Sequence, residues 1–304
     1  MRTLTTLALA LAAGALAAPA AAAPLPGAPA CPILPPGNVW NQPVDTLPRA
    51  ADSARLIRSI GIGERLHPDF SDRGRYGIPI NIVGAGTPRT RVRFDYADES
   101  DRVGYPIPAR PRIEQGGDRH ILMLDRDACR LYEIFAARRG SAGRWSAGSG
   151  AVFDLRSNAL RPAGWTSADA AGLPILPGLA RHDEVAGGGI DHALRFTASR
   201  TRRAYIHPAR HAASDSSDPA LPPMGLRVRL KASVPLSGLG PQARAVAVAL
   251  KRYGMILADN GSPWYVTGAP DAGWDDDDLR GLSRIRGRDF EVVDTRRLRS
   301  TATG

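Results

Sequence analysis

The sequence predicts a mostly β protein, a single two-sheet β-sandwich of jelly-roll type with two or three peripheral helices. Three observations lead to this fold class. Short runs that alternate apolar and polar residues recur along the chain, as half-buried strands do. The 32 glycines and 26 prolines mark many turns between these runs. The chain has no rhythm of strand, helix and strand, which a parallel α/β sheet requires.

The N-terminus has the features of a secretory signal peptide at 1–23. Arg2 precedes an apolar run and small residues follow it. The run, at 4–17, has 14 residues, fewer than the roughly 20 that span a bilayer. We therefore expect a secreted, extracellular protein without a membrane span. Beyond the signal we expect a proline-rich extended lead-in at 24–37, one sandwich domain at 38–295 and a disordered tail at 296–304.

Helices and hairpins follow from end signals and turn residues. The best helix covers 241–252, with proline in its first turn, and a weaker one covers 49–60. The clearest hairpin pairs 120–124 with 130–136. Asn-Gly inside a four-residue turn predicts another hairpin, and the strands that it joins are 255–258 and 264–266.

Further strands are assigned from alternation with a period of two. In 224–232, leucines and a valine alternate with Arg227, Arg229 and Lys231, which predicts one core face and one basic face. The other expected strands lie at 77–83, 91–96, 145–149, 151–155, 190–196, 203–207 and 290–293. The stretch 156–182 between them is long and irregular, and a loop of this kind is often functional.

Cys31 and Cys129 are the two cysteines of the chain. In an exported protein they are expected to form a disulfide that ties the lead-in to the core. The alternative is a pair of buried thiols. Two cysteines are too few for a structural zinc site with cysteine ligands, and we expect no metal site or cofactor. A calcium site at the acidic run 275–278 is the alternative to its role as a helix start.

The formal net charge of +10 comes almost entirely from arginine. A positive balance attracts anionic polymers. However, the arginines are scattered as singles and doublets, without a basic helix or a basic strand studded with aromatic residues. Nucleic acid is therefore not an expected partner. The oligomeric state is not predicted.

Four residues are candidates for catalysis. Glu133 shares an apolar strand face, which should raise the pKa of its carboxyl as a general acid requires. Asp183 and Glu184 precede three glycines, and His192 lies on the apolar face of the strand that follows. The plain alternatives are an ion pair between Glu133 and an arginine, solvated loop acids beside Arg181, and a core histidine with satisfied hydrogen bonds.

Other residues are candidates for contact with a substrate. They are Asp118 and His120 at the start of the hairpin, Trp165 in the long loop, and Arg181 and Arg195 on either side of the acidic stretch. The sequence has no Gly-x-Ser-x-Gly elbow, phosphate loop or His-Glu-x-x-His motif, so serine hydrolase chemistry has no support.

Three stretches together resemble a family of secreted bacterial proteins, mostly from high-GC genomes. They are Leu131-Tyr132-Glu133, the segment from Gly172 to Glu184 with Ile190-Asp191-His192-Ala193-Leu194, and Tyr253-Gly254-Met255-Ile256 with Asp259-Asn260-Gly261. The resemblance implies a jelly-roll, concanavalin-A-like fold similar to that of polysaccharide hydrolases and lyases. It assigns no catalytic residue.

These observations favour a secreted polysaccharide hydrolase with a pair of carboxylates in a groove of the sandwich. Glycoside hydrolysis needs two acids about 5–9 Å apart, and Glu133 with Glu184 or Asp183 is the predicted pair. A lyase would instead use His192 or a tyrosine as base, with an arginine that neutralises a uronate. Two alternatives without chemistry are a module that binds a polysaccharide or cell-wall polymer, and a structural envelope protein whose acids are all paired.

Overall fold

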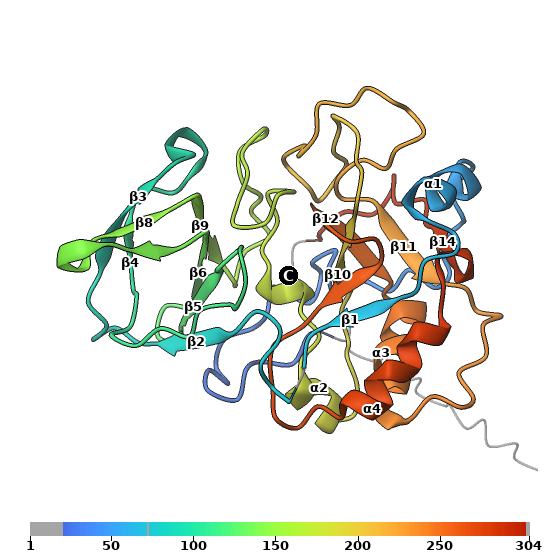
Figure 1. Ribbon diagram of the computed structural model, residues 1–304, viewed down its shortest axis with the longest axis horizontal. Coiled ribbons are helices and arrows are strands. Elements are labelled where there is room, and N and C mark those ends of the chain that lie inside the picture. Colours follow the sequence, from blue (N-terminus) through green and yellow to red (C-terminus); the bar gives the residue numbers. More distant parts are fainter. Residues whose placement is uncertain (1–20, 72, 302–304) are drawn as a thin grey trace, which may run out of the picture.

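The computed structural model describes residues 21–71 and 73–301 (Figure 1). Among these, more residues lie in strands than in helices, and the strands form three sheets. The prediction of a mostly β protein is confirmed. The two-sheet jelly-roll sandwich is not confirmed, because each sheet contains a parallel pair of strands, whereas jelly rolls are built from antiparallel strands. The predicted signal peptide lies outside the described residues except for its last three.

Two lobes are visible in Figure 1, and we call the part built from β2 to β9 the N-lobe. One N-lobe sheet contains, in order, β2 (Ile80–Val83), β5 (Ile121–Asp125), β6 (Arg130–Phe135) and β9 (Ser149–Asp154). The other contains β4 (Gly104–Tyr105), β3 (Thr90–Phe94), β8 (Trp145–Ala147) and β7 (Arg138–Arg139). The predicted hairpin is confirmed, since β5 and β6 pair antiparallel across their whole length.

The C-lobe is one six-stranded sheet with helices. Its strand order is β1 (His67–Asp69), β13 (Tyr265–Thr267), β10 (Leu194–Ala198), β12 (Met255–Asn260), β11 (Arg227–Leu230) and β14 (Phe290–Val292). The helices are α1 (Ser53–Ile60), α2 (His182–Ala186), α3 (Pro241–Arg252) and α4 (Asp276–Leu279). The 3₁₀ turns are η1 (Ala97–Glu99), η2 (Ser141–Gly143), η3 (Leu176–Gly178), η4 (Arg280–Arg284) and η5 (Gly287–Asp289).

The prediction for α3 is confirmed at both ends, whereas the second hairpin was wrong. Strands β12 and β13 follow each other in the chain but do not pair, because β10 lies between them and pairs with both. The Asn-Gly turn therefore joins two strands that are next-nearest neighbours. A local turn signal reports a reversal of the chain but not the partner of each strand.

The C-lobe sheet has one apolar face and one polar face. Phe196 and Val266 lie opposite each other and are buried in the core, where Phe196 stacks on Trp264. Helix α3 packs against β11 in the same lobe. Because successive side chains of a strand alternate, Arg195 and Thr267 point to the other face. That polar face carries the residues described in the next section.

Arg227 on β11 belongs to the basic face predicted for this strand, but the structure buries it. Its guanidinium donates hydrogen bonds to the carbonyl oxygens of Val39, Gln42 and Tyr253 at 2.6–3.0 Å. Burial lowers the pKa of Arg227 to about 9. The side chain thereby fastens the start of the chain to the sheet.

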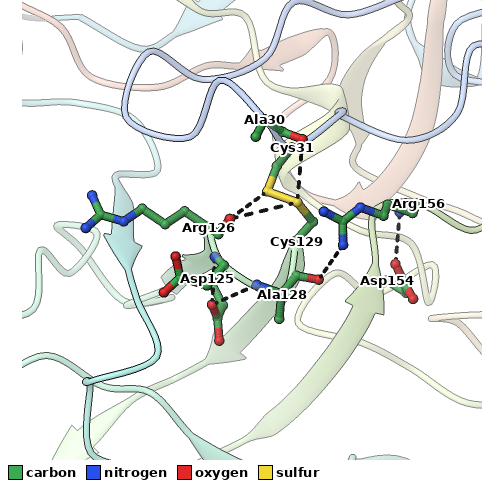
Figure 2. Close-up of a disulfide and its surroundings, with 9 residues drawn as sticks. Ala30, Cys31, Asp125, Arg126, Ala128, Cys129, Asp154 and Arg156 are labelled. Atoms are coloured by element: carbon green, nitrogen blue, oxygen red, sulfur yellow. Dashed lines mark hydrogen bonds between the residues drawn. A yellow bond between two sulfur atoms is a disulfide. The ribbon is translucent and has the colours of Figure 1, made fainter.

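The lead-in is part of the core. Cys31 and Cys129 form the predicted disulfide, which joins residues 98 apart in the sequence and is therefore confirmed (Figure 2). Leu25 and Ile33 are buried in the same apolar cluster as strands of both lobes. The stretch expected to be a disordered tail also makes contacts: Thr301 N donates to Gly37 O, and Leu298 packs on the core. Within the described ranges, no helix has the length and apolar character to cross a bilayer.

Candidate active site

A row of polar side chains crosses three strands of the C-lobe sheet. Asp69 on β1 lies opposite Thr267 on β13. The antiparallel register of β13 and β10 in turn places Thr267 opposite Arg195. Nη1 of Arg195 donates a hydrogen bond to Thr267 Oγ1 at 2.6 Å, which agrees with this placement. Arg195 is thus fixed in the middle of the polar face.

Arg195 also binds Asp169, which belongs to residues 155–181 between β9 and α2, and we call these residues the connecting segment. Nε donates to Oδ2 at 3.1 Å and Nη2 to Oδ1 at 2.9 Å. Both residues are buried, with 4% and 0% of their surface exposed. A two-point pair between an arginine and a carboxylate is strong and fixed in geometry. It attaches the connecting segment to the sheet.

Asp259 reaches the same face through an irregularity in β12. Strands β10 and β12 pair in regular register up to Phe196, which lies opposite Leu257. The register then shifts by one residue, so that Thr197 lies opposite Asp259. Ala258 is the extra residue, a β-bulge. Without the bulge, Asp259 would point to the apolar face. With it, Oδ2 of Asp259 lies 3.8 Å from Nη2 of Arg195.

The environment of Asp259 favours its protonated form. Burial raises the pKa of its carboxyl to about 7, the negative charge of Asp169 acts in the same direction, and Arg195 acts against both. The side chain keeps 26% of its surface exposed. A carboxylic acid that is half protonated near neutral pH and open to solvent is suited to general acid catalysis.

His120 connects the N-lobe to this cluster. Its Nδ1 lies 2.5 Å from Oε2 of Glu114, and its Nε2 lies 3.0 Å from the carbonyl oxygen of Ala168. Because both nitrogens face acceptors, the ring is a cation with two N–H donors. Burial lowers the pKa of His120, but the hydrogen bond and charge of Glu114 outweigh it, so the net shift is upward. The charge of His120 lowers the pKa of Asp259, against the larger effect of burial.

A pocket of about 310 Å³ lies where the lobes meet, and we call it the junction pocket. Ligand sites commonly have roughly 300–1,000 Å³. The N-lobe contributes Tyr96, Glu99, Phe135 and Ser149, the connecting segment contributes Thr166, Ser167, Ala168 and Ala170, and the C-lobe contributes His211, Ala213 and Asp259. Asp259 is thus the point where the Arg195 cluster reaches this pocket.

Glu99 brings a second carboxylate to the junction pocket, from the N-lobe wall. Its Oε2 accepts a hydrogen bond from Thr166 N at 3.0 Å and lies 3.8 Å from Nε2 of His211. The other ring nitrogen of His211 is 2.7 Å from the carbonyl oxygen of Ala170. Glu99 and His211 keep 37% and 27% of their side-chain surfaces exposed. The pocket therefore joins two acids, one from each lobe, with an imidazole beside one of them.

No family model, curated protein or solved structure matches this chain. The chemistry of the junction pocket is therefore argued from its own residues. The likeness to secreted bacterial proteins with a jelly-roll fold stays a prediction.

Glu133, a predicted catalytic acid, is buried on β6. Its carboxylate accepts hydrogen bonds from the backbone nitrogens of Ile175 and Leu176, each at 3.0 Å. Burial raises its pKa to about 7 against the effect of these bonds, which is the direction expected from its apolar strand face. Among the described residues, Glu133 is not part of the lining of the junction pocket. Its contacts hold the connecting segment against the N-lobe.

The other predicted acids lie in a second buried cluster around α2. Glu184 Oε1 is 2.7 Å from Nη2 of Arg181, and its Oε2 is 3.1 Å from Nε2 of His192. Asp183 lies 3.5 Å from Arg181. Nδ1 of His192 faces the carbonyl oxygen of Ala193 at 2.8 Å. The core-histidine interpretation thus fits His192, and Arg181 is engaged with acids and with the backbone of Ala23.

The pKa of Glu184 reflects this pairing. Burial would raise it, but the charge and hydrogen bond of His192, followed by those of Arg181, lower it to about 2. A carboxyl that is ionised at neutral pH and only 2% exposed is poorly placed to give a proton to a polymer. Glu133 and Glu184 are thus both buried with separate protein partners, and neither is among the described residues that line the junction pocket.

The two remaining predicted substrate contacts lie in different places. Trp165 precedes Thr166 of the pocket wall, and the guanidinium of Arg161 lies 5.5 Å from its ring. Asp118 is exposed, and it lies near Asp69 of β1, whose pKa is raised mainly by burial and to a smaller extent by the charges of Glu114 and Asp118. Asp275 accepts hydrogen bonds from the nitrogens of Asp277 and Asp278, so the acidic run begins α4 as a helix cap. Within 21–71 and 73–301, no three His, Cys, Asp or Glu side chains form a metal-binding group.

Sequence reasoning missed Asp259, Asp169 and Glu99. Asp259 was interpreted as a turn residue, although an acid at the end of the apolar run 255–258 was a usable signal, since strand ends gather at the edge of a sheet. Asp169 lies in an irregular segment and Glu99 ends the short 3₁₀ turn η1, and periodicity carries little information at either place. His120 and Arg195, by contrast, were predicted as cleft residues and do lie in the cluster beside the pocket.

Proposed function

We propose that the protein is a secreted polysaccharide hydrolase that works in the junction pocket, with Asp259 as general acid and Glu99 as the second carboxylate. The observation that carries this proposal is the position of Asp259, an acid with a pKa of about 7 on the wall of a pocket that also holds Glu99. Two carboxyls with different environments are what glycoside hydrolysis requires.

In the proposed reaction, Asp259 gives its proton to the glycosidic oxygen while the bond from that oxygen to the anomeric carbon breaks. The Glu99 carboxylate either attacks the anomeric carbon or takes a proton from the attacking water. In the first route a water molecule then attacks the anomeric carbon, its proton passes to the Asp259 carboxylate, and the bond between the sugar and Glu99 breaks. His211, 3.8 Å from Glu99, is placed to orient that carboxylate. The anomeric form of the first product distinguishes the two routes.

Export is part of the proposal. The apolar run at 4–17 and the disulfide between Cys31 and Cys129 support an extracellular location, since disulfides persist in oxidising compartments. The likeness to secreted proteins of high-GC bacteria supports the same location. Its jelly-roll architecture stays part of that proposed relationship.

The experiment is a screen for turnover. The full chain after export is incubated with neutral and anionic polysaccharides, while reducing ends and the absorbance of unsaturated products are followed. Asp259→Asn and Glu99→Gln should each lower the rate by about 10²–10⁴-fold. Glu184→Gln, in the cluster around α2, is the matched control and should keep its rate per folded molecule.

The outcomes separate the candidate functions. Turnover that survives both Asp259→Asn and Glu99→Gln contradicts the assignment. Unsaturated products in place of reducing ends alone would favour a lyase. Binding across the panel without turnover would favour a non-catalytic module.

A further inference from the structure

A second cavity lies at the β1 edge of the C-lobe sheet. It has about 560 Å³, and we call it the β1 cleft. Its wall includes His67 and Asp69 of β1, Tyr265 of β13, and Tyr76. Asp276 and Arg280, from α4 and η4, close the other side. None of these residues takes part in the chemistry proposed above.

Aromatic rings form one wall of the β1 cleft. His67 lies opposite Tyr265 in the parallel pair of β1 and β13, and the two rings stack with centroids 4.1 Å apart. The His67 side chain is 50% exposed and Tyr76 is 54% exposed, so these rings are open to a ligand. Burial lowers the pKa of His67, which keeps the imidazole neutral at neutral pH. Flat, uncharged and partly exposed rings suit the apolar face of a sugar.

The β1 cleft and the junction pocket share one face of the sheet. Tyr265 points to the same face as Thr267, two residues along β13, and therefore to the face of Arg195. Asp259 is directed to that face by the bulge in β12. The strand order β1, β13, β10 and β12 thus places the stacked rings at the β1 edge of the sheet and the proposed acid on the third strand from β1.

The distance between the rings at β1 and Asp259 on β12 sets the minimum length of a ligand that contacts both. Three inter-strand steps separate β1 from β12, and each step is about 4.8 Å, so the span is about 14 Å. A single sugar ring is too short to lie on the rings at β1 and also reach Asp259. A chain of several sugars has the necessary length.

The charges around the β1 cleft disfavour an acidic chain. Asp69 and Asp276 line it, and Glu114 and Asp118 lie close enough to Asp69 to raise its pKa, after burial, which has the larger effect. Among the described residues of the wall, the one arginine is Arg280, which is paired with Asp277. Arg195, which could have met a carboxylate, is committed to Asp169 and Thr267. The described wall of the cleft therefore offers the carboxylate of a uronate no uncommitted arginine.

From these observations we propose that the β1 cleft is a binding subsite for an uncharged polysaccharide, whose chain continues across the sheet face to the junction pocket. This inference rests on the proposed function, because it identifies the substrate of that function as a neutral polymer. The rings of His67, Tyr76 and Tyr265 bind sugar units remote from the cleaved bond.

The test uses binding to a variant that does not cleave. In an Asp259→Asn background, dissociation constants are measured for a soluble neutral glucan, xylan and mannan, for polygalacturonate, and for a disaccharide. At least one neutral polymer should bind more tightly than its disaccharide and more tightly than polygalacturonate. Adding Tyr265→Ala, His67→Ala or Tyr76→Ala should raise the dissociation constant for that polymer about three- to tenfold, the size of one aromatic stacking contact.

Two further variants control for folding and position. Tyr265→Phe keeps the ring and should bind the polymer as the background does. Tyr205→Ala removes an exposed tyrosine that lines neither cavity and should leave the dissociation constant unchanged. Because Tyr76 is exposed, Tyr76→Ala carries the test even where Tyr265→Ala fails to fold.

The result that overturns the inference is equal binding by the three cleft variants and their background. Binding of polygalacturonate alone, or of no polymer, overturns it as well. Failure of the proposed function has a different signature, namely a wild-type protein that binds a neutral polymer through the β1 cleft but releases no reducing ends.

Discussion

Arg195 holds both carboxylate oxygens of Asp169 while one of its nitrogens lies 3.8 Å from Asp259. Asp169 thus accepts hydrogen bonds from two nitrogens of Arg195. After burial, the negative charge of Asp169 is the next cause that raises the pKa of Asp259. The Arg195–Asp169 pair attaches the connecting segment to the sheet, and its two charges act in opposite directions on the pKa of the proposed acid, which burial raises most. The first prediction separates these two effects.

Replacing Asp169 with asparagine should lower the pKa of Asp259. The substitution removes the negative charge of Asp169, which raises the pKa of Asp259. The positive charge of Arg195, which lowers that pKa, is then no longer offset by Asp169. The alkaline limb of the rate profile should then move to lower pH. Asp215→Asn, at an exposed position, is the control and should leave that limb in place. A limb that does not move in Asp169→Asn would show that Asp259 does not sense this charge.

The wild-type rate should fall as pH rises through about 7. Asp259 must be protonated to act as general acid, and its pKa is raised to about 7. Above that pH the fraction of protonated acid drops tenfold per pH unit. The measurement is kcat/KM against pH on the polysaccharide that the screen identifies. A rate that stays level from pH 6 to 9 would exclude Asp259 as the acid.

Glu133 should make folding stability depend on pH. Its folded pKa of about 7 lies above its ordinary value of 4.5. Its proton therefore favours the folded state below pH 4.5, and this contribution is lost as pH rises through about 7. The glutamine in Glu133→Gln cannot ionise, so it does not add this pH dependence. The unfolding free energy of wild type minus that of Glu133→Gln should therefore be larger at pH 5 than at pH 8. Urea titrations at both pH values measure it, and an equal gap at both would contradict it.

Glu184 should matter for folding rather than for catalysis. It is 2% exposed and paired with both Arg181 and His192. Breaking a buried pair on one side costs about 3–5 kcal/mol, because the partner charge stays buried. Glu184→Gln should therefore lower the unfolding free energy by that amount, whereas Asp183→Asn, at a side chain that is 30% exposed, should cost about 1 kcal/mol or less.

Acid should reproduce part of the loss in Glu184→Gln. The folded pKa of Glu184 is about 2, below its ordinary 4.5. The stability that it contributes is therefore present above pH 4.5 and is lost as pH falls through about 2. Wild type and Glu184→Gln should converge in stability over that interval. Curves that stay parallel down to pH 2 would contradict the pairing.

The sequence was a good guide where structure depends on neighbouring residues. Helix α3 and the hairpin of β5 and β6 follow from local end signals and alternation. The disulfide followed from the count of cysteines and the expected compartment. His120 was recognisable because it begins the predicted hairpin, and Arg195 because it follows the acidic stretch at 183–184 on the polar side of an alternating strand.

The pairing of distant strands could not be predicted in this way. Strand β1 pairs with β13, and β10 separates β12 from β13, so the face that holds Asp259 depends on contacts between segments far apart in the chain. The direction of Asp259 depends further on one extra residue, Ala258. Alternation predicts which residues of a strand share a face, but neither the neighbouring strand nor a bulge is encoded in it. The predicted pairing of Glu133 with Glu184 likewise rested on sequence patterns, which carry no information on the distance between two segments.

Loss of the disulfide should weaken the whole fold. Cys31 anchors the lead-in to the turn before β6, and the lead-in residues Leu25 and Ile33 belong to the core that both lobes share (Figure 2). Removing a cross-link between residues 98 apart frees the unfolded chain and typically costs about 2–5 kcal/mol. The double variant Cys31→Ser with Cys129→Ser should lose stability in this range.

Reduction of the wild-type protein should give the same loss as this double variant, since both open the same cross-link. Urea titrations of the wild type with and without dithiothreitol measure the loss on reduction. Dithiothreitol should have no effect on the stability of the double variant. Equal stability of the oxidised and reduced wild type would mean that packing alone holds the lead-in. In that case the lead-in would stay bound through Leu25, Ile33 and the hydrogen bonds of Arg227 to Val39 and Gln42.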